Sequence, residues 1–253
     1  MNAQQQSNLL INRTILVTGA SDGIGREAAM TYARQGARVL LAGRNRQKLN
    51  QVRDDIATAG LTPAQVLVLD FATATPEDCR QLADDIATMT PVLDGVLHNA
   101  SILGTLQPMA DIPPAEWSQV MKVNLDTTFF LTQALLPLLL TSPSPSLVFT
   151  SSSVGREGRA GWGTYAVSKF ATEGMMQILA AEYKDTALRV NCINPGGTRT
   201  AMRASAFPEE NAAKLKTPAE IMPVYLYLMS DESLGKTGIS FDAQPGRKAG
   251  PAV

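Results

Sequence analysis

Apolar, β-prone runs alternate with helical patterns along almost the whole chain, and this alternation restricts the possible folds more than any other feature of the sequence. The runs that predict strands are Thr14–Thr18, Val39–Ala42, Gln65–Leu69, Leu93–Leu97, Leu147–Thr150, Leu188–Ile193 and the short Ile239–Asp242. The helical patterns cover Gly23–Gln35, Arg46–Ala59, Pro76–Thr88, Glu116–Leu140, Thr164–Tyr183 and Pro218–Met229. Such a repeat predicts a doubly wound α/β fold, with a parallel sheet of about seven strands and helices on both faces.

Composition and loop lengths indicate a single domain over residues 1–253. The chain has 253 residues, of which 45% are hydrophobic and 18% are charged, as in a globular protein with a sizeable core. No Pro/Gly/Ser-rich linker divides the strand–helix pattern, because the loop Thr141–Ser146 is too short to separate two domains. Residues 247–253, which follow Gly246, are expected to form a loose tail.

The charge balance and the scarcity of cysteine and histidine exclude several classes of protein. A formal net charge of −1 gives no attraction to nucleic acid or to an anionic membrane. The start of the chain is polar and the apolar run Ala134–Leu140 is too short to cross a bilayer, so a cytoplasmic protein is expected. Cys79, Cys192 and His98 are too few for an ordinary zinc site, and no metal is expected. One histidine and no Gly-x-Ser-x-Gly motif also disfavour a Ser-His-Asp hydrolase.

Three glycines lie between the first strand and the first helix, in the loop Thr18-Gly19-Ala20-Ser21-Asp22-Gly23-Ile24-Gly25. In a doubly wound sheet, ligands bind at the carboxyl ends of the strands, where this loop is placed. Glycine lets backbone amides approach a pyrophosphate, and the N-terminus of the following helix attracts an anion. A turn without a ligand is the alternative. The residues predicted to bind a dinucleotide here are Gly19, Ser21, Asp22, Gly23, Ile24 and Gly25.

The end of the second strand indicates which nicotinamide dinucleotide the site prefers. Proteins that prefer NAD(H) carry an acidic residue there for the ribose 2′-hydroxyl. This chain has Gly43 and then Arg44, whose guanidinium can bind a 2′-phosphate, so NADP(H) is expected over NAD(H). Arg46 is interpreted as a solvated charge, and Asp22 argues mildly against NADP(H) because its charge lies near the phosphates. Asp70, after the third strand, either binds the adenine amino group or stabilises a turn.

Tyr165 and Lys169 are four residues apart in a helical pattern, so their side chains share one face. The pKa of a tyrosine hydroxyl is near 10, and an adjacent ammonium together with an oxidised nicotinamide lowers it toward the range useful for acid–base catalysis. The run Ser151–Ser153 follows the fifth strand on the ligand side of the sheet, where a hydroxyl can donate to a substrate oxygen. The Tyr-x-x-x-Lys spacing alone is weak evidence, and a helix-surface contact is the alternative.

Taken together, these motifs have the order seen in the short-chain dehydrogenase/reductase family, which the chain resembles over nearly its whole length. The matching residues are Thr18-Gly19-x-x-x-Gly23-x-Gly25, Asn99-Ala100, Asn124, Ser152, Tyr165-x-x-x-Lys169, Asn194-Pro195-Gly196 and Thr200. The resemblance implies one doubly wound Rossmann domain that transfers a hydride between nicotinamide and a carbonyl or alcohol carbon. It also implies a homodimer or homotetramer formed through the two long helices.

The resemblance further implies a role for each residue of the site. Ser152 would hydrogen-bond the substrate carbonyl and Tyr165 would donate or accept the proton. Lys169 would lower the pKa of the tyrosine and bind the nicotinamide ribose, and Asn124 would anchor a water that relays protons to Lys169. Asn99 would hold the strand end near the cofactor. The residues expected to border the nicotinamide are Pro195, Gly196 and Thr200.

Departures from the family pattern occur in two motifs and affect four positions. Ser101 stands where the family has a glycine close to the cofactor, so cofactor affinity or geometry is expected to differ. His98 replaces an asparagine and is assigned no catalytic role. The usual late Asp-Gly-Gly reads Asp242-Ala243-Gln244, which affects the expected oligomer interface.

Residues 200–217 correspond to a segment that is a mobile lid over the substrate pocket in the family. One or two of the arginines in loops near the predicted site are hypothesised to face an anionic substrate, with solvated surface arginines as the alternative. These arginines are Arg156, Arg159, Arg199 and Arg203.

The function expected from the sequence is an NADP(H)-dependent oxidoreductase that acts on an unidentified small carbonyl or alcohol compound. A non-catalytic NADP(H)-binding sensor or scaffold is the alternative from another class, although it would need neither Tyr165 nor Lys169. Epimerisation or dehydration of a nucleotide sugar is a further alternative, disfavoured because relatives with those activities tend to be longer.

Overall fold

The computed structural model describes residues 8–247 and 250, and its seven strands form one parallel sheet in the order β3-β2-β1-β4-β5-β6-β7. The strands are β1 (Thr14–Thr18), β2 (Arg38–Gly43), β3 (Gln65–Val68), β4 (Gly95–His98), β5 (Ser146–Thr150), β6 (Arg189–Asn194) and β7 (Ser240–Asp242). Every neighbouring pair is parallel. This sheet confirms the doubly wound α/β fold and all seven expected strands.

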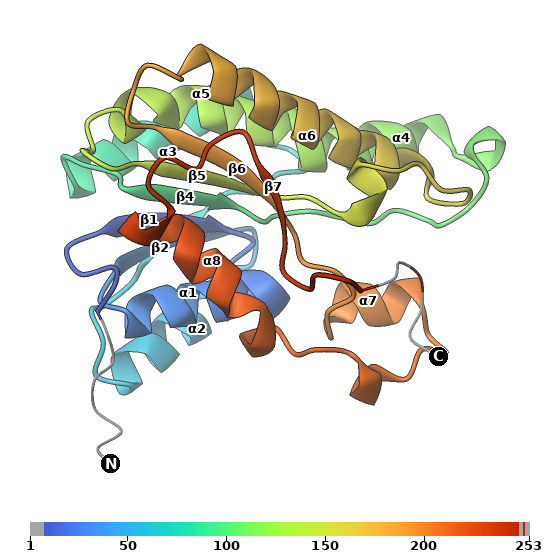
Figure 1. The fold of residues 1–253 in the computed structure, drawn as a ribbon, viewed down its shortest axis with the longest axis horizontal. Helices are drawn as coiled ribbons and strands as arrows, with labels where there is room; N and C mark the ends of the chain where they lie inside the picture. Colours follow the sequence, from blue (N-terminus) through green and yellow to red (C-terminus); the bar gives the residue numbers. More distant parts are fainter. Residues whose placement is uncertain (1–7, 248–249, 251–253) are drawn as a thin grey trace.

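Helices cover both faces of the sheet, as Figure 1 shows. One face carries α1 (Gly23–Arg34), α2 (Arg46–Thr58) and α8 (Met222–Met229); the other carries α3 (Pro76–Met89), α4 (Pro114–Met121), α5 (Thr127–Leu139) and α6 (Gly163–Glu182). Strand alternation divides the core between the two faces, because Ile15 and Val17 of β1 belong to the apolar cluster with α1, whereas Leu16 belongs to the cluster with α3. None of the helices in the described part of the chain is long and apolar enough to cross a membrane.

The order in which the chain adds strands to the sheet changes direction between β1 and β4. From β1 the chain proceeds outward through β2 to β3, and then returns to β4 on the other side of β1 and continues to β7. Loops that follow β1 and β4 therefore diverge and leave a crevice between them, which is where open α/β sheets bind ligands. The glycine loop and Asn99 lie at this crevice.

The prediction of one long helix over Glu116–Leu140 is wrong in its middle. The segment is divided into α4 and α5 by a π-helical turn, η2 (Lys122–Asp126), and α5 continues through Pro137 without a break. At the π-helical turn, Asn124 donates to the Ile102 carbonyl oxygen at 2.9 Å and accepts from the Ile102 amide at 2.8 Å. The π-helical turn places the Asn124 side chain where it can make both hydrogen bonds with the distant Ile102 loop. Such turns are common at functional sites.

Other elements differ from the expected boundaries by a few residues. The expected helix Pro218–Met229 begins as the 3₁₀ turn η5 (Ala219–Ile221) before α8. The remaining short elements are the 3₁₀ turns η1 (Met109–Asp111), η3 (Ser153–Gly155), η4 (Ala212–Lys214) and η6 (Asp231–Ser233), and the helix α7 (Ala201–Ala206). Of the tail expected over 247–253, residues 248, 249 and 251–253 lie outside the described residues, whereas the Gly250 carbonyl oxygen accepts from Arg203 at 2.7 Å.

His98, the only histidine of the chain, is buried at the end of β4. Its Nε2 lies 3.0 Å from the Thr132 hydroxyl, and its ring stacks on Phe149 with centroids 5.2 Å apart. Nδ1 is buried with no hydrogen-bond partner among the residues described. Burial lowers the pKa of His98 to about 3, so the ring is neutral in the folded protein at neutral pH.

We expect His98 to make folding less favourable as the pH falls from 7 to 5. The pKa of histidine in the unfolded chain is about 6.5, and the folded-state pKa is lower. The part of the free energy of unfolding that depends on a neutral His98 is therefore fully present above pH 6.5 and is lost progressively below it. At pH 5 the loss is about 2 kcal/mol. Urea unfolding at both pH values measures it, and His98→Asn should lose about 2 kcal/mol less than the wild type. An equal loss in both proteins would contradict this assignment.

Candidate active site

A cavity of about 330 Å³ lies at the carboxyl ends of the strands and is lined by residues from β1 to the loop after β6. Twelve of the residues predicted from the sequence line it: Gly19, Ser21, Asp22, Gly23, Ile24, Arg44, Asp70, Asn99, Tyr165, Lys169, Pro195 and Thr200. The cavity also includes side chains that the sequence did not single out, among them Phe71, Ile102, Thr150 and Met202. No local motif marks these residues, because it is the fold that brings them to the cavity.

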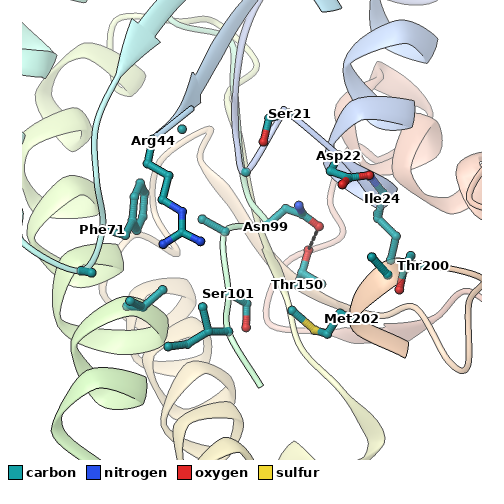
Figure 2. A pocket seen from close by; sticks show the side chains of 18 of the residues that line it. Ser21, Asp22, Ile24, Arg44, Phe71, Asn99, Ser101, Thr150, Thr200 and Met202 are labelled. Atoms are coloured by element: carbon teal, nitrogen blue, oxygen red, sulfur yellow. Dashed lines mark hydrogen bonds between the residues drawn. The ribbon is translucent and has the colours of Figure 1, made fainter. Parts of the chain in front are cut away.

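The glycine loop is packed tightly against the end of β4. Gly19 has φ +66°, and a Cβ built there would lie 2.9 Å from the Ala100 Cα atom. A Cβ at Gly25 would lie 2.3 Å from the Gly19 carbonyl oxygen, so only glycine lets the first turn of α1 pack behind the loop. Gly25 therefore supports the predicted phosphate loop from behind without lining the cavity. Asn99 reinforces the junction, because its side-chain oxygen accepts from the Thr150 hydroxyl at 3.4 Å (Figure 2).

Asp22 caps the N-terminus of α1 beneath the loop. Its side chain accepts a hydrogen bond from the Gly23 amide at 2.7 Å, which fixes the start of the helix. Lys48 of α2 lies 3.5 Å from the second carboxylate oxygen, with both side chains more than half exposed. This ion pair reduces the negative charge that made Asp22 an argument against NADP(H).

Arg44 extends from the end of β2 into the cavity on the side where Phe71 lies (Figure 2). It is exposed, and within the described part of the chain no carboxylate forms an ion pair with it. Its guanidinium is therefore available to a ligand. Asp70 lines the same cavity while one of its carboxylate oxygens accepts from the Ala72 amide at 3.0 Å, so the turn role is confirmed. Contact between Asp70 and adenine stays a prediction.

Two buried hydroxyl groups with no protein partner test whether the cavity suits a polar cofactor. The oxygens of Ser101 and Ser151 are both buried without a hydrogen bond to any described residue, and both serines line the cavity. Buried hydroxyls normally find a partner, so these two fit a ligand that carries amide, ribose or phosphate groups. Ser101 is also compatible with its backbone, because Asn12 is the only non-glycine residue with positive φ among those described.

Tyr165 and Lys169 lie on one face of α6 and both enter the cavity, as their spacing predicted. Ser152, two residues after the end of β5, lies beside the tyrosine hydroxyl and acts to lower its pKa, which opposes the effect of burial. Burial nevertheless dominates and raises the pKa of Tyr165 to about 12. Desolvation of the phenol is the larger of the two effects on this pKa, and the lowering expected from Lys169 together with an oxidised nicotinamide stays a prediction. At neutral pH, Tyr165 is protonated and can donate.

Lys169 is almost completely buried, and its Nζ atom donates to the Thr150 carbonyl oxygen at 2.8 Å. Burial lowers the pKa of Lys169 to about 8, while the nearby Cys192 and Glu173 oppose this effect. Glu173 lies one turn further along α6, is buried, and accepts from the Ser240 hydroxyl at 2.7 Å. It is a residue that the sequence analysis missed, although its spacing of four from Lys169 places it on the same helix face.

Asn124 lies in the π-helical turn with its side chain fully engaged by the protein. Besides its two bonds with Ile102, it donates to the Ser168 hydroxyl at 3.0 Å. The amide thus ties the loop after β4 to α6 and is not directed at Lys169. An anchoring role toward a water would fall on its main-chain oxygen, and that role stays a prediction.

The Pro195–Gly196 turn is supported by the carboxyl-terminal segment. Gln244 donates to the Pro195 carbonyl oxygen at 2.9 Å and to the Gly197 carbonyl oxygen at 3.0 Å. Gly196 has φ +68°, which favours glycine at this turn. Thr200 caps α7 by accepting from the Arg203 amide at 3.2 Å, and its methyl carbon is close to Gly23. The predicted border of the nicotinamide is therefore a rigid turn followed by the start of the lid segment.

The lid segment 200–217 is closed at its base, where the Arg199 amide donates to the Lys216 carbonyl oxygen at 2.8 Å. The Arg199 side chain donates to the carbonyl oxygens of Ala212 at 2.8 Å and Leu215 at 3.1 Å. Arg199 is thus used within the segment and is not available to a substrate. Whether the segment moves stays a prediction. Among the residues described, no group of His, Cys, Asp and Glu side chains is arranged to hold a metal ion.

Comparison with known proteins agrees with this geometry. Residues 13–211 match the family described as short chain dehydrogenase. The chain is 65% identical over 250 residues, covering 99% of both chains, to the uncharacterized oxidoreductase YciK of Escherichia coli K12. It is 29% identical to cyclohexanol dehydrogenase of an Acinetobacter strain, covering 93% of this chain and 94% of the relative.

Solved structures are similar over the whole fold. A short-chain dehydrogenase of Shigella flexneri complexed with NADP has a TM-score of 0.93 and 64% identity, covering 95% of this chain and all of the other. One of Escherichia coli CFT073 complexed with NADPH has a TM-score of 0.93 and 66% identity, with the same coverage. The glycine loop, the Ser152–Tyr165–Lys169 cluster and these likenesses agree, and the chain belongs to the short-chain dehydrogenase family of oxidoreductases.

Proposed function

We propose that the protein is an NADP(H)-dependent carbonyl reductase or alcohol dehydrogenase that acts on a small molecule. The observation that supports this most strongly is that Tyr165 and Lys169 line the same cavity as Arg44, which has no ion-pair partner in the described part of the chain, while Ser152 lies beside the tyrosine hydroxyl. A sensor or scaffold would need only the groove. The NADP- and NADPH-bound relatives support the same cofactor here.

When bound, the nicotinamide supplies or accepts the hydride, and the residues of this chain control the proton. Ser152 donates a hydrogen bond to the substrate oxygen. Tyr165, which is protonated at neutral pH because burial raises its pKa to about 12, donates its proton to that oxygen as the alcohol forms. The ammonium of Lys169 then stabilises the phenolate, and the pKa of Lys169, about 8, suits it to return a proton to Tyr165. Dehydrogenation reverses these steps.

The cofactor would lie across the glycine loop. Backbone amides of Ser21 and Ile24 and the N-terminus of α1 would hold the pyrophosphate, and Arg44 would bind the 2′-phosphate. Asn99 and the Pro195–Gly196 turn would border the nicotinamide half.

A titration of the purified protein with NADPH and with NADH tests this function. Cofactor fluorescence reports binding, and absorbance of the nicotinamide reports oxidation with a panel of ketones, aldehydes and quinones. Tight NADPH binding with oxidation is the expected result. Tight binding without oxidation across the panel would instead favour the sensor, and failure to bind either cofactor would contradict the proposal.

We also propose that the protein is a homodimer or homotetramer formed through α5 and α6. An apolar groove of about 930 Å³ lies between these helices, and its exposed members include Phe129, Leu140 and Ile178, with exposed fractions of 46%, 42% and 59%. Exposed apolar side chains that lie next to one another can mark an interaction surface in a soluble protein. The occupant we infer is the same face of a second copy, because two such faces are self-complementary about a twofold axis.

Ile178→Asp is expected to convert the oligomer to smaller species, because a buried, unpaired carboxylate at the interface is costly. Sedimentation velocity at micromolar concentration measures the change. Ile11→Asp is the matched control, since Ile11 is also 59% exposed and does not line the groove. If both variants sediment like the wild type, the interface lies elsewhere.

A further inference from the structure

A second cavity, of about 550 Å³, adjoins the catalytic residues, and none of the glycine-loop residues 18–25 lines it. It is lined by the loop that connects Ser152 to α6, by the turn after β6 and by the carboxyl-terminal segment from Asp242 onward. Its lining is mainly polar. Ligand pockets of small-molecule enzymes have volumes in this range.

The two cavities meet at Ser152 and Tyr165. Tyr165 lines the first cavity, beside the predicted nicotinamide site, and Ser152 lines the second. A substrate oxygen bound by both hydroxyls would therefore have the rest of the substrate in the second cavity. Trp162 forms an apolar wall there. Its ring centroid lies 5.9 Å from the ring centroid of Tyr165 and 6.0 Å from that of Phe207.

Positive charge predominates in this second cavity. Its described lining includes four arginines and two acids: Arg156, Arg159, Arg203 and Arg247, and Glu157 and Asp242. Two of the arginines are paired with acids at short distance, and a third lies near a buried carboxylate. Arg156 pairs with Asp242, and Arg203 holds the buried carboxylate of Glu210 in two bonds of 2.6 and 2.7 Å. Arg247 packs on Gly197, 3.9 Å from Glu210.

Arg159 is the arginine whose charge is least compensated. The carboxylate nearest to it within the described chain is that of Glu157, at 3.9 Å, and the Glu157 side chain is 79% exposed. A pair of this length with a solvated partner is weak. The Arg159 side chain itself is only 28% exposed, so its guanidinium is partly shielded from water at the cavity wall. A partly desolvated, weakly paired guanidinium attracts an anion.

We propose that the substrate is a carbonyl or alcohol compound with a carboxylate or phosphate group, and that Arg159 binds this anion. The inference rests on the proposed function, since it places the reacting carbon at Ser152 and Tyr165. The carbon skeleton would lie along Trp162 and the anion would lie at Arg159, which makes Arg159 a determinant of substrate specificity.

A pair of aldehydes that differ only in charge tests the proposal. 4-Carboxybenzaldehyde carries a carboxylate, and methyl 4-formylbenzoate carries a neutral ester in the same position. For the wild type we expect a lower KM for the acid. Arg159→Gln should raise the KM for the acid by roughly 10- to 150-fold, with kcat and the KM for the ester nearly unchanged. Arg53→Gln is the matched control, because it removes a partly exposed arginine of α2 outside both cavities.

A binding measurement separates this proposal from the proposed function. Calorimetry on the NADP⁺-saturated protein with terephthalate should show binding to the wild type and to Arg53→Gln, weakened roughly 10- to 150-fold in Arg159→Gln. If neither aldehyde is reduced but terephthalate still binds through Arg159, the anion site stands and the reductase function fails for these probes. If the acid and the ester are reduced with the same KM in the wild type and Arg159→Gln, or if terephthalate does not bind, the anion site is overturned.

Discussion

Tyr165→Phe is expected to lower kcat/KM for NADPH-dependent carbonyl reduction by roughly 10²- to 10⁴-fold, the usual contribution of a positioned general acid. The substitution removes only the hydroxyl, and the ring keeps its place beside Trp162 and beneath the Lys169 ammonium, which lies 5.5 Å from the ring centroid. The dissociation constant of NADPH should therefore change little. Steady-state kinetics on the best carbonyl substrate of the panel, together with NADPH fluorescence titration, measure both quantities.

Tyr227→Phe is the control for this variant. Tyr227 belongs to α8, packs against Phe241 and lies outside the cavity. Loss of its hydroxyl should therefore leave kcat/KM unchanged. Two results would contradict the assignment of Tyr165 as the proton donor. One is full activity of Tyr165→Phe; the other is a loss of activity that is matched by an equal loss of NADPH binding.

Arg44→Gln is expected to remove the preference for NADPH. A charge-assisted bond to the 2′-phosphate contributes about 1.5–3 kcal/mol, so the ratio of the NADH to NADPH dissociation constants should fall by roughly 10- to 150-fold. The change should come from weaker NADPH binding, because NADH has no 2′-phosphate for Arg44 to bind. Fluorescence titration with both cofactors measures the ratio.

Arg46→Gln provides the comparison for Arg44. Arg46 is also exposed, but it begins α2 and does not line the cavity, so its loss should leave the ratio nearly as in the wild type. Equal effects of the two substitutions would indicate that only the general positive charge near the groove matters. An unchanged ratio in Arg44→Gln would place the 2′-phosphate elsewhere.

Local patterns in the sequence determined the order of strands and helices and the loops that carry the site. Strand and helix periodicities, and the glycines that permit tight turns, are properties of neighbouring residues, and they can be recognised without the fold. Because parallel strands end at one edge of the sheet, Gly19, Arg44 and Tyr165 could be assigned to one site from positions far apart in the chain.

Contacts between distant segments decided what the local patterns could not. The bonds of Asn124 with Ile102 accompany a π-helical turn inside a segment whose periodicity predicts one helix. Burial raises the pKa of Tyr165 above its usual value and lowers that of Lys169, and the four-residue spacing of the pair does not indicate either effect.

The four candidate arginines illustrate the same division. The sequence placed Arg156, Arg159, Arg199 and Arg203 near the site but could not rank them. The fold engages Arg199 with backbone carbonyls of the lid segment, Arg203 with Glu210 and Arg156 with Asp242, and it leaves Arg159 beside a solvated carboxylate. The sequence determines which residues carry a charge. Whether a given charge is already neutralised depends on the tertiary structure, because packing brings groups that are distant in the chain within a few ångströms of it.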